Sequence, residues 1–310
     1  MSDAPLLLPS RPEAQRGQIR PSATAEITCA QRAAETLMPP ERRLIDDPYA
    51  RLFLRSRSMR VRCSSEVAAR LTLRVFDRRY PGFMAIVLLR NRWYEEVLAQ
   101  AVVEGIGQVV LLGAGYDTTS LRLELGGARL FEVDAAPTQQ AKRWALTRHR
   151  VQPAADVTYV ACDFERDDLT EQLLASGFDP SARSLVVWYG VSFFLSEQAV
   201  RQTVADVARL SAPGSQFLWD YLDASVVDGT TTFPGALRAR AAVARRGEPY
   251  TFGLTADTVG DVLEPYGFAV RHHVRITDLA HRYRGTDPIW CSDDDFVGIL
   301  VAERRSEVAA

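Results

Sequence analysis

The segment from Gln108 to Asp134 constrains the fold of this chain more than any other part of its sequence. Residues Val109 to Leu112 form a short apolar run of the kind that a fully buried parallel strand requires. Gly113 and Gly115 follow, and glycine lets the backbone turn sharply and approach a ligand closely. We expect a helix next, and then a second strand ending at Asp134, whose carboxylate can accept hydrogen bonds from ribose hydroxyls. The segment therefore predicts a nucleoside site in an α/β fold.

The residues after the second glycine help to identify the nucleoside. A dinucleotide site prefers glycine or alanine at position 118, where pyrophosphate lies on the helix amino end, and this chain has Thr118. Asp117 would repel a diphosphate, whereas the ammonium and sulfonium groups of S-adenosylmethionine tolerate or favour a nearby carboxylate. These residues favour S-adenosylmethionine over NAD(P). A structural turn without a ligand stays as a third interpretation, because a single glycine turn is weak evidence.

The chain has 310 residues, enough for one large α/β domain with elaborations, and a formal net charge of -2. This charge disfavours a nucleic-acid partner, because such proteins carry a strong basic field. The basic run from Arg51 to Arg62 could indicate an anionic partner, but its interleaved apolar residues favour an amphipathic surface helix.

No run approaches the ~20 apolar residues that span a bilayer, and the amino terminus lacks the apolar core of a signal peptide. We therefore expect a cytoplasmic protein with no membrane partner, either a monomer or a homodimer. The four cysteines are scattered, without a CxxC pair or a histidine at ligand spacing. This pattern predicts reduced thiols and no metal site.

The domain organisation follows from composition and periodicity. Residues 1–22 are rich in proline, arginine and glutamine, which predicts a disordered or draped tail. Residues 23–310 are predicted to form a single domain. Its expected parts are a helical cap at 23–104, a cofactor-binding core at 105–222, an inserted lid at 223–252 and closing strands at 253–310.

A second acidic position follows the third expected strand, Val157 to Ala161. In a methyltransferase with such a sheet, Asp163 can accept a hydrogen bond from the adenine amino group while Phe164 packs on the ring. The alternative is that Asp163 caps the next helix.

Six short segments, taken in order, carry a family pattern: Thr24 to Arg32, Asp46 to Ala50, Leu89 to Tyr94, Leu111 to Thr118, Phe131 to Asp134 and Cys162 to Phe164. Together they resemble the leucine carboxyl methyltransferase family, which includes bacterial polyketide O-methyltransferases. The resemblance implies a class I methyltransferase fold. This fold is an α/β, Rossmann-like, mostly parallel sheet with an antiparallel last strand, to which the amino-terminal helical cap and the inserted lid are added.

The resemblance also implies roles for individual residues. Arg92 would pair with the carboxylate of the methionine moiety, which suits a bidentate guanidinium, although Arg90 competes for this role from a different face of the helix. Arg32 would meet the same carboxylate. Gly113 and Gly115 would line the methionine and ribose portion, Asp134 would hold the ribose, and Asp163 with Phe164 would hold the adenine.

One position departs from the family pattern. The family usually has an acid after the fourth strand, near the amino group of the cofactor, and here Tyr189 stands there. A phenol carries no negative charge at neutral pH without strong perturbation. Asp117 or a backbone carbonyl would then serve the ammonium, or Tyr189 would position the substrate.

Methyl transfer from a sulfonium is an in-line displacement, so the protein must mainly align the nucleophile and exclude water. The four histidines offer no clear base, which favours a carboxyl acceptor over a hydroxyl, because a carboxylate is already ionised at neutral pH. An aromatic lining for the acceptor pocket is expected from Trp93, Tyr189, Phe193, Phe194, Tyr221 and Phe233.

We therefore expect a small-molecule O-methyltransferase of specialised metabolism, such as antibiotic or polyketide biosynthesis. Two alternatives stay open. One is a methyltransferase for a protein carboxyl terminus, which would need an open groove, and the other is a catalytically silent protein that binds S-adenosylmethionine.

Overall fold

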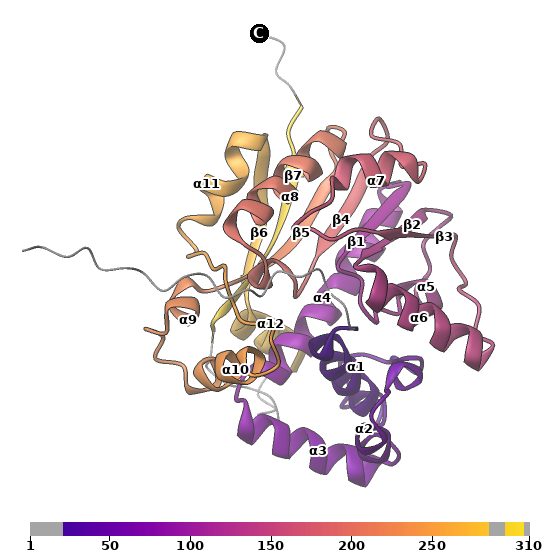
Figure 1. The fold of residues 1–310 in the computed structure, drawn as a ribbon, viewed down its shortest axis with the longest axis vertical. Helices are drawn as coiled ribbons and strands as arrows, with labels where there is room; N and C mark the ends of the chain where they lie inside the picture. Colours follow the sequence, from indigo (N-terminus) through magenta and orange to yellow (C-terminus); the bar gives the residue numbers. More distant parts are fainter. Residues whose placement is uncertain (1–20, 285–294, 307–310) are drawn as a thin grey trace, which may run out of the picture.

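The chain begins with a group of helices, after which strands and helices alternate (Figure 1). A computed structural model describes residues 21–284 and 295–306. The predicted tail, residues 1–22, lies outside the described residues except for Pro21 and Ser22. None of the described helices combines the length and the apolar character needed to cross a bilayer.

A seven-stranded sheet has the strand order β3-β2-β1-β4-β5-β7-β6. The first five strands are parallel, whereas β7 runs antiparallel to both β5 and β6. The sheet confirms the expected α/β class I methyltransferase fold with an antiparallel last strand. The strands are β1 Gln108–Leu112, β2 Arg129–Asp134, β3 Val157–Ala161, β4 Ser184–Trp188, β5 Gln216–Leu222, β6 Phe268–Arg275 and β7 Val297–Arg304.

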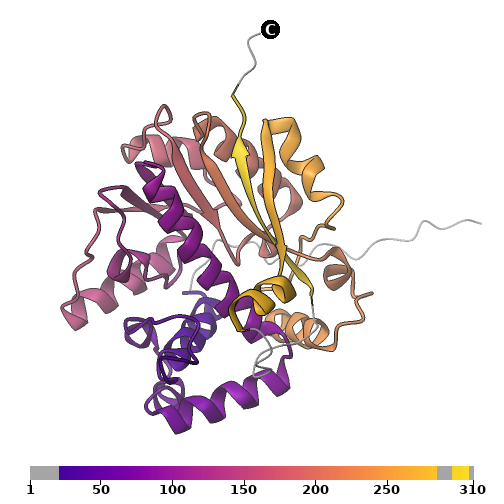
Figure 2. The ribbon, with the colours of Figure 1, turned by 180° about the vertical axis from the view of Figure 1, so that it is seen from behind.

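Both faces of the sheet are covered by helices, because alternate residues of each central strand point to opposite sides. Val109 and Leu111 of β1 pack in one buried cluster with residues of α4, α6 and α12, whereas Val110 and Leu112 pack in another with α7, α8 and α11 (Figures 1 and 2). These flanking helices are α4 Phe83–Val103, α6 Ala136–His149, α7 Leu169–Ala175, α8 Glu197–Leu210, α11 Val259–Leu263 and α12 Ile276–Arg284.

The remaining helices gather around the ends of the sheet strands in Figure 1, mostly beyond the carboxyl end of β1. The amino-terminal group is α1 Ala23–Glu35, η1 Ala50–Phe53, α2 Arg57–Arg62 and α3 Glu66–Arg79. The segment after β5 holds α9 Ala224–Asp228 and α10 Pro234–Ala244, and short turns form α5 Thr119–Arg122, η2 Ser192–Phe194 and η3 Glu264–Tyr266.

Two elements differ from the expectation. The helix expected between β1 and β2 is only the four residues of α5. Gly126 and Gly127, with φ values of 57° and 86°, lie in the left-handed region soon after it, and glycine is a poor helix former. No helix is predicted after β6, yet α12 forms there and packs against α4.

Candidate functional site

A cavity of about 1130 Å³ lies at the carboxyl ends of β1, β2 and β4. Strand order reverses at β1, which pairs with β2 on one side and β4 on the other, and ligands of open α/β sheets bind at such a point. Residues of α1 and α4 and the segment 247–251 also line the cavity. The predicted residues that line it are Arg32, Gly113, Gly115, Asp117, Asp134, Asp163, Phe164 and Tyr189.

The glycine turn after β1 forms the floor of this cavity. Gly113 and Gly115 have φ values of 70° and 49°, which only glycine adopts without strain. A Cβ atom at position 113 would lie 2.2 Å from Cγ2 of Val191. The turn therefore tolerates no side chain at Gly113, because Val191 fills that space, and Gly113 and Gly115 both line the cavity.

Asp134 stands at the carboxyl end of β2, beside the glycine turn. Its Oδ2 accepts a hydrogen bond from the Gly115 amide, and its Oδ1 accepts one of 2.7 Å from the Ala135 amide. Burial raises the pKa of Asp134 to about 6, although both amides favour the ionised form. A carboxylate can accept about four hydrogen bonds, so two acceptor positions remain for a pair of hydroxyls.

Asp163 and Phe164 follow β3 and line the same cavity. Asp163 accepts a hydrogen bond of 3.1 Å from the Glu165 amide. Asp168, not Asp163, caps α7 by accepting from the Glu171 amide at 3.0 Å. The capping role is thus taken by another residue, and the Asp163 carboxylate, which also pairs with Arg166 at 3.8 Å, lines the cavity wall.

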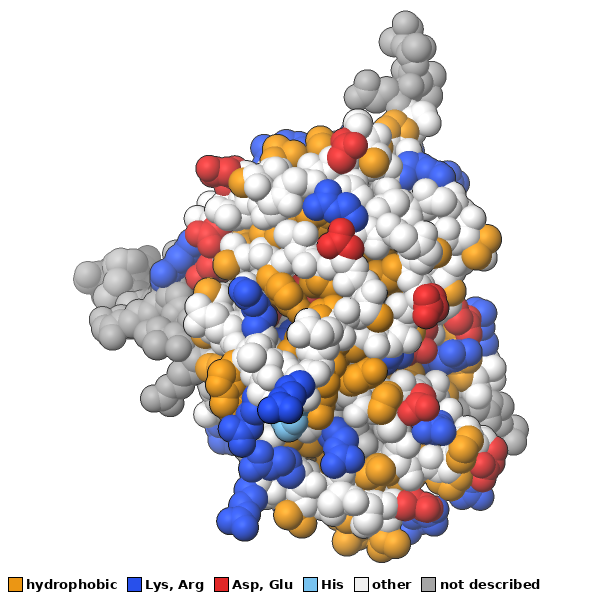
Figure 3. Space-filling view, turned by 90° about the vertical axis from the view of Figure 1, so that its right-hand side faces the viewer, with side chains coloured by type: hydrophobic (Ala, Val, Ile, Leu, Met, Phe, Trp, Pro, Cys, Tyr) orange, Lys and Arg blue, Asp and Glu red, His pale blue; other side chains and the backbone are white. Residues whose placement is uncertain are grey.

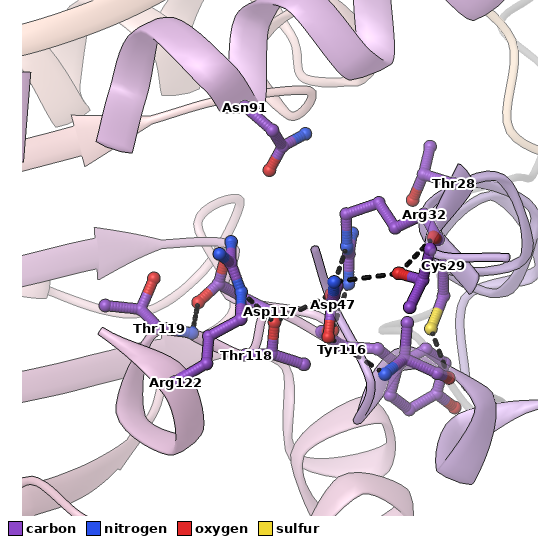
Figure 4. Close-up of polar contacts among 12 residues, drawn as sticks. Thr28, Cys29, Arg32, Asp47, Asn91, Tyr116, Asp117, Thr118, Thr119 and Arg122 are labelled. Atoms are coloured by element: carbon purple, nitrogen blue, oxygen red, sulfur yellow. Dashed lines mark hydrogen bonds and ion pairs between the residues drawn. The ribbon is translucent and has the colours of Figure 1, made fainter. Parts of the chain in front are cut away.

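Arg32 of α1 reaches the cavity from the side opposite the sheet. Its Nε donates to Oδ2 of Asp47 at 2.9 Å, and its Nη2 donates to the Tyr116 carbonyl at 2.5 Å (Figure 4). Thr118 also donates to Asp47, at 2.8 Å. Asp47 therefore joins α1 to the glycine turn and fixes the guanidinium, which explains the use of the Asp46 to Ala50 segment.

Asp117 lies opposite Asn91 of α4 across an open part of the cavity (Figure 4). Its Oδ1 accepts from the Thr119 amide at 2.7 Å. Figure 4 also shows Thr28 of α1 beside this space. Thr28 and Asn91 are cavity residues that the sequence analysis did not single out; only their nearness to Arg32 and Arg92 in two of the family segments pointed to them.

The structure places Arg92 outside the cavity, contrary to the expectation. Its guanidinium pairs with Glu96 at 3.3 Å and with Glu95 at 3.8 Å, and it lies over the Tyr283 ring. Arg90 lines the cavity instead. Successive helix residues are rotated by about 100°, so residues two apart point to different sides.

Arg90 forms a buried ion pair with Asp220 of β5. The Gly190 amide donates to the other oxygen of Asp220 at 2.8 Å. Asp220 was not predicted, although a single acid in the apolar strand Gln216–Leu222 is a visible signal. A buried charge is retained in a strand only where it has a partner.

Tyr189 lies beside this pair and lines the cavity. Burial raises the pKa of Tyr189 well above its usual value, so the phenol is neutral at pH 7. Its hydroxyl is buried and has no hydrogen-bond partner among the residues that the structure describes. A buried hydroxyl without a partner is costly, which makes Tyr189 a group available to a ligand.

The far part of the cavity is aromatic. Phe193, Phe194 and Tyr250 form a cluster whose ring centres are 4.8 to 5.4 Å apart. Trp93, Tyr221 and Phe233 do not line the cavity, contrary to the expectation, because Trp93 and Tyr221 are core residues and Phe233 packs on Phe296. None of the four histidines lines it.

The residues at the cavity suit S-adenosylmethionine. The glycine turn lines the cavity, Asp134 retains acceptors for a diol, and Arg32 offers a cation beside Asp117. Carboxylates and a guanidinium around one cavity match a ligand with hydroxyl, ammonium and carboxylate groups.

Comparisons with known proteins agree with this geometry. The family model for leucine carboxyl methyltransferase matches residues 25–208, more than half of the chain. A "Putative S-adenosyl-L-methionine-dependent methyltransferase" of Mycobacterium marinum is 31% identical over 207 residues, covering 66% of this chain and 67% of that protein. A protein of the same name from Saccharopolyspora erythraea is 30% identical over 251 residues, covering 78% and 81%.

The crystal structure of a "putative methyltransferase" from Thermobifida fusca has the same fold, with a TM-score of 0.55 and 15% identity over 93% of this chain and 96% of that one. The chain thus belongs to the leucine carboxyl methyltransferase family, and it is an S-adenosylmethionine-dependent methyltransferase.

Proposed function

We propose that this enzyme methylates an oxygen atom, in a carboxyl or hydroxyl group, of a small aromatic or polyketide-like molecule of specialised metabolism. One observation carries the proposal. A single cavity extends from the predicted cofactor residues Asp134 and Asp163 to the aromatic cluster of Phe193, Phe194 and Tyr250. Its volume exceeds the ~300 to 1000 Å³ typical of sites for one small ligand, so it suits a cofactor and an acceptor together.

In this proposal the cofactor lies along the strand ends. Asp134 accepts from the ribose, Asp163 and Phe164 meet the adenine, and the turn at Gly113 and Gly115 approaches the chain between them. Arg32 replaces Arg92 as the partner of the methionine carboxylate, because Arg32 lines the cavity and Arg92 does not.

The sulfonium of S-adenosylmethionine supplies an electrophilic methyl group when it is bound. The protein then has to align an acceptor oxygen and exclude water. Arg90 and Tyr189 offer a cation and a hydroxyl that no described residue hydrogen-bonds, near the proposed acceptor end. These groups would hold a carboxylate acceptor, which needs no base, whereas a hydroxyl acceptor positioned by the neutral phenol of Tyr189 would have to release its proton to water.

The segment 247–251 would help to exclude water. Glu248 accepts hydrogen bonds from the Thr24 hydroxyl and, at 3.3 Å, from the Thr24 amide. This contact joins the segment after α10 to the start of α1, and both line the cavity.

A cytoplasmic location and a monomeric or dimeric state belong to the same proposal. The thiols of Cys29, Cys63 and Cys162 form no disulfide, which supports a reducing compartment.

Methyl transfer from S-adenosylmethionine with a radiolabelled methyl group tests the proposal. The acceptor panel should contain aromatic carboxylic acids, phenols and peptides with a free carboxyl terminus. Mild alkali releases methanol from a methyl ester and leaves a methyl ether intact, so alkali treatment of the product separates carboxyl from hydroxyl acceptors. Labelled aromatic acids or phenols would support the proposal.

Labelled peptides with unlabelled small molecules would instead show a protein carboxyl methyltransferase. Binding of S-adenosylhomocysteine can be checked separately by its stabilisation of the fold. Binding without turnover on any acceptor would favour the catalytically silent alternative.

A further inference from the structure

Helix α3 carries apolar side chains on two sides. Ala69 and Leu73 are buried in the cluster that contains α1, whereas Val67, Leu71 and Val75 are 79%, 63% and 57% exposed. The three exposed residues are spaced four apart, so they form one continuous ridge. A surface helix needs only its core-facing stripe to be apolar, and the second ridge is therefore not explained by folding.

Arginines surround this ridge. They lie on α3 and on the preceding helix α2, and they are Arg57, Arg60, Arg62, Arg70, Arg74, Arg78 and Arg79. In the part of the chain that the structure describes, Arg70 alone among them has an ion-pair partner, Glu66. An amphipathic surface helix, expected over Arg51 to Arg62, would bury its apolar face. Helix α2 buries none of its six residues, so packing of such a helix does not explain the arginines.

The local charge is opposite in sign to that of the chain. Residues 51–80 contain nine arginines against Glu66 and Asp77, a charge of +7, whereas the whole chain has a net charge of -2. Blue side chains are frequent over the lower half of the molecule in Figure 3, the half that holds α2, α3 and the end of α6 in Figure 1. Like charges this close repel one another, so the arrangement costs stability unless an anionic partner offsets it.

We propose that α2 and α3 form a docking surface for an acidic protein that presents an apolar groove between helices. We call this the α2–α3 surface. It consists of the ridge formed by Val67, Leu71 and Val75 and of the seven arginines of α2 and α3 that surround the ridge. An apolar helix face fits a hydrophobic groove between two helices, and the arginines match acidic residues at the groove edge.

Two other anionic partners fit less well. Membrane-binding helices bury aromatic and long apolar side chains, and this ridge has two valines and one leucine. A nucleic acid would bring phosphates against the apolar ridge and leave it unpaired. Because α3 packs against α1 and α4, which line the cavity, the docked protein would lie next to the cap of the active site.

A designed probe tests the surface directly. It is a fluorescein-labelled helical hairpin with a leucine-lined groove edged by glutamates, and its binding to the full chain is followed by fluorescence anisotropy. Leu71→Glu, and separately Arg74→Glu with Arg78→Glu, should each weaken binding by at least about tenfold, since each removes one component of the interface. Higher salt should weaken wild-type binding and affect the double arginine variant less.

Matched variants control for exposure and charge. Val103→Glu changes a residue that is 82% exposed at the end of α4, and Arg143→Glu with Arg148→Glu reverses two exposed arginines of α6. Both should bind the probe as the wild type does. All variants should keep the wild-type affinity for S-adenosylhomocysteine, which shows that they are folded.

The proposal is overturned if the wild type and Leu71→Glu bind the probe equally, or if a hairpin with lysines in place of glutamates binds as well. Leu71-dependent sedimentation with phosphatidylglycerol vesicles, without probe binding, would show a membrane surface instead. Self-association lost in Leu71→Glu would show that the occupant is a second copy of this chain.

Discussion

The guanidinium of Arg90 lies over the ring of Tyr189, with its Cζ 5.3 Å from the ring centre, while it pairs with Asp220. The Asp220 carboxylate also accepts from the Gly190 amide, immediately after Tyr189. The family usually has an acid at the end of the fourth strand. Here a carboxylate stands next to that position, but it comes from the neighbouring strand β5.

The ion pair between Arg90 and Asp220 is buried, so breaking it should be more harmful than removing it. Asp220→Ala leaves the guanidinium buried without its partner, and we expect a loss of ~3 to 5 kcal/mol in the free energy of unfolding. Arg90→Met with Asp220→Leu removes both charges and should cost less than Asp220→Ala alone. Urea denaturation of the three proteins measures this, and an equal or larger loss in the double variant would contradict the argument.

Tyr189→Phe removes a hydroxyl that has no partner among the described residues. Because no hydrogen bond is lost and the desolvation cost of the hydroxyl is removed, the free energy of unfolding should not fall and should rise by about 1 kcal/mol. If the hydroxyl positions the acceptor, kcat/KM for methyl transfer should fall about tenfold while the Kd for S-adenosylhomocysteine stays constant. Unchanged turnover would remove Tyr189 from the proposed acceptor site.

Cofactor affinity should depend on pH through Asp134. Burial raises the pKa of this carboxyl group to about 6. Ribose hydroxyls donate to the ionised carboxylate, so S-adenosylhomocysteine should bind best above about pH 7 and up to about tenfold more weakly per pH unit below 6. The unliganded protein has the opposite trend, because a raised carboxyl pKa lowers stability as the pH rises from about 4 to 6.

The increase in melting temperature caused by S-adenosylhomocysteine should therefore grow with pH over this range. In Asp134→Asn the Kd measured by calorimetry should be weaker and should no longer change with pH in this window. The same pH dependence in wild type and variant would assign the titration to another group.

Substitution of the two arginines predicted to pair with the methionine carboxylate should affect the Kd for S-adenosylhomocysteine differently. Arg32→Lys keeps the charge but loses the fork that holds Asp47 and the Tyr116 carbonyl together, so the Kd for S-adenosylhomocysteine should rise about tenfold to a hundredfold. Arg92→Ala removes a half-exposed side chain outside the cavity and should change the Kd less than about twofold. A larger effect of Arg92→Ala would restore the original assignment.

Much of the sheet is predictable from sequence, because a buried parallel strand such as β1 is a continuous apolar run bounded by glycine. Asp134 and Asp163 follow from the same logic, since parallel strands end at one edge of a sheet. The orientation of α4 is not predictable in this way. Its residues Met84 to Asn91 are all buried, so no single polar face shows whether Arg90 or Arg92 points into the cavity.

The contacts of Asp220 and Glu248 could not be predicted from the sequence for a different reason. Asp220 pairs with Arg90 at a separation of 130 residues, and Glu248 bonds to Thr24 at a separation of 224. Neither contact has a local spacing signal, because each exists only after the sheet has brought distant segments together. The periodicity of a helix or strand indicates which of its faces is buried. It does not indicate which distant polar groups form a hydrogen bond or an ion pair with each other.

The contact between Glu248 and Thr24 leads to the last prediction. Glu248→Ala should loosen the segment 247–251 from α1, because the amide and the hydroxyl of Thr24 both lose their acceptor. Hydrogen bonds to a partly exposed carboxylate contribute about 1 kcal/mol, so the dissociation rate of S-adenosylhomocysteine should rise about fivefold in stopped-flow measurements. Glu264→Ala, at an exposed acid of η3 outside the cavity, is the matched control and should leave this rate unchanged. If both variants release the ligand at the wild-type rate, the segment 247–251 does not close the site.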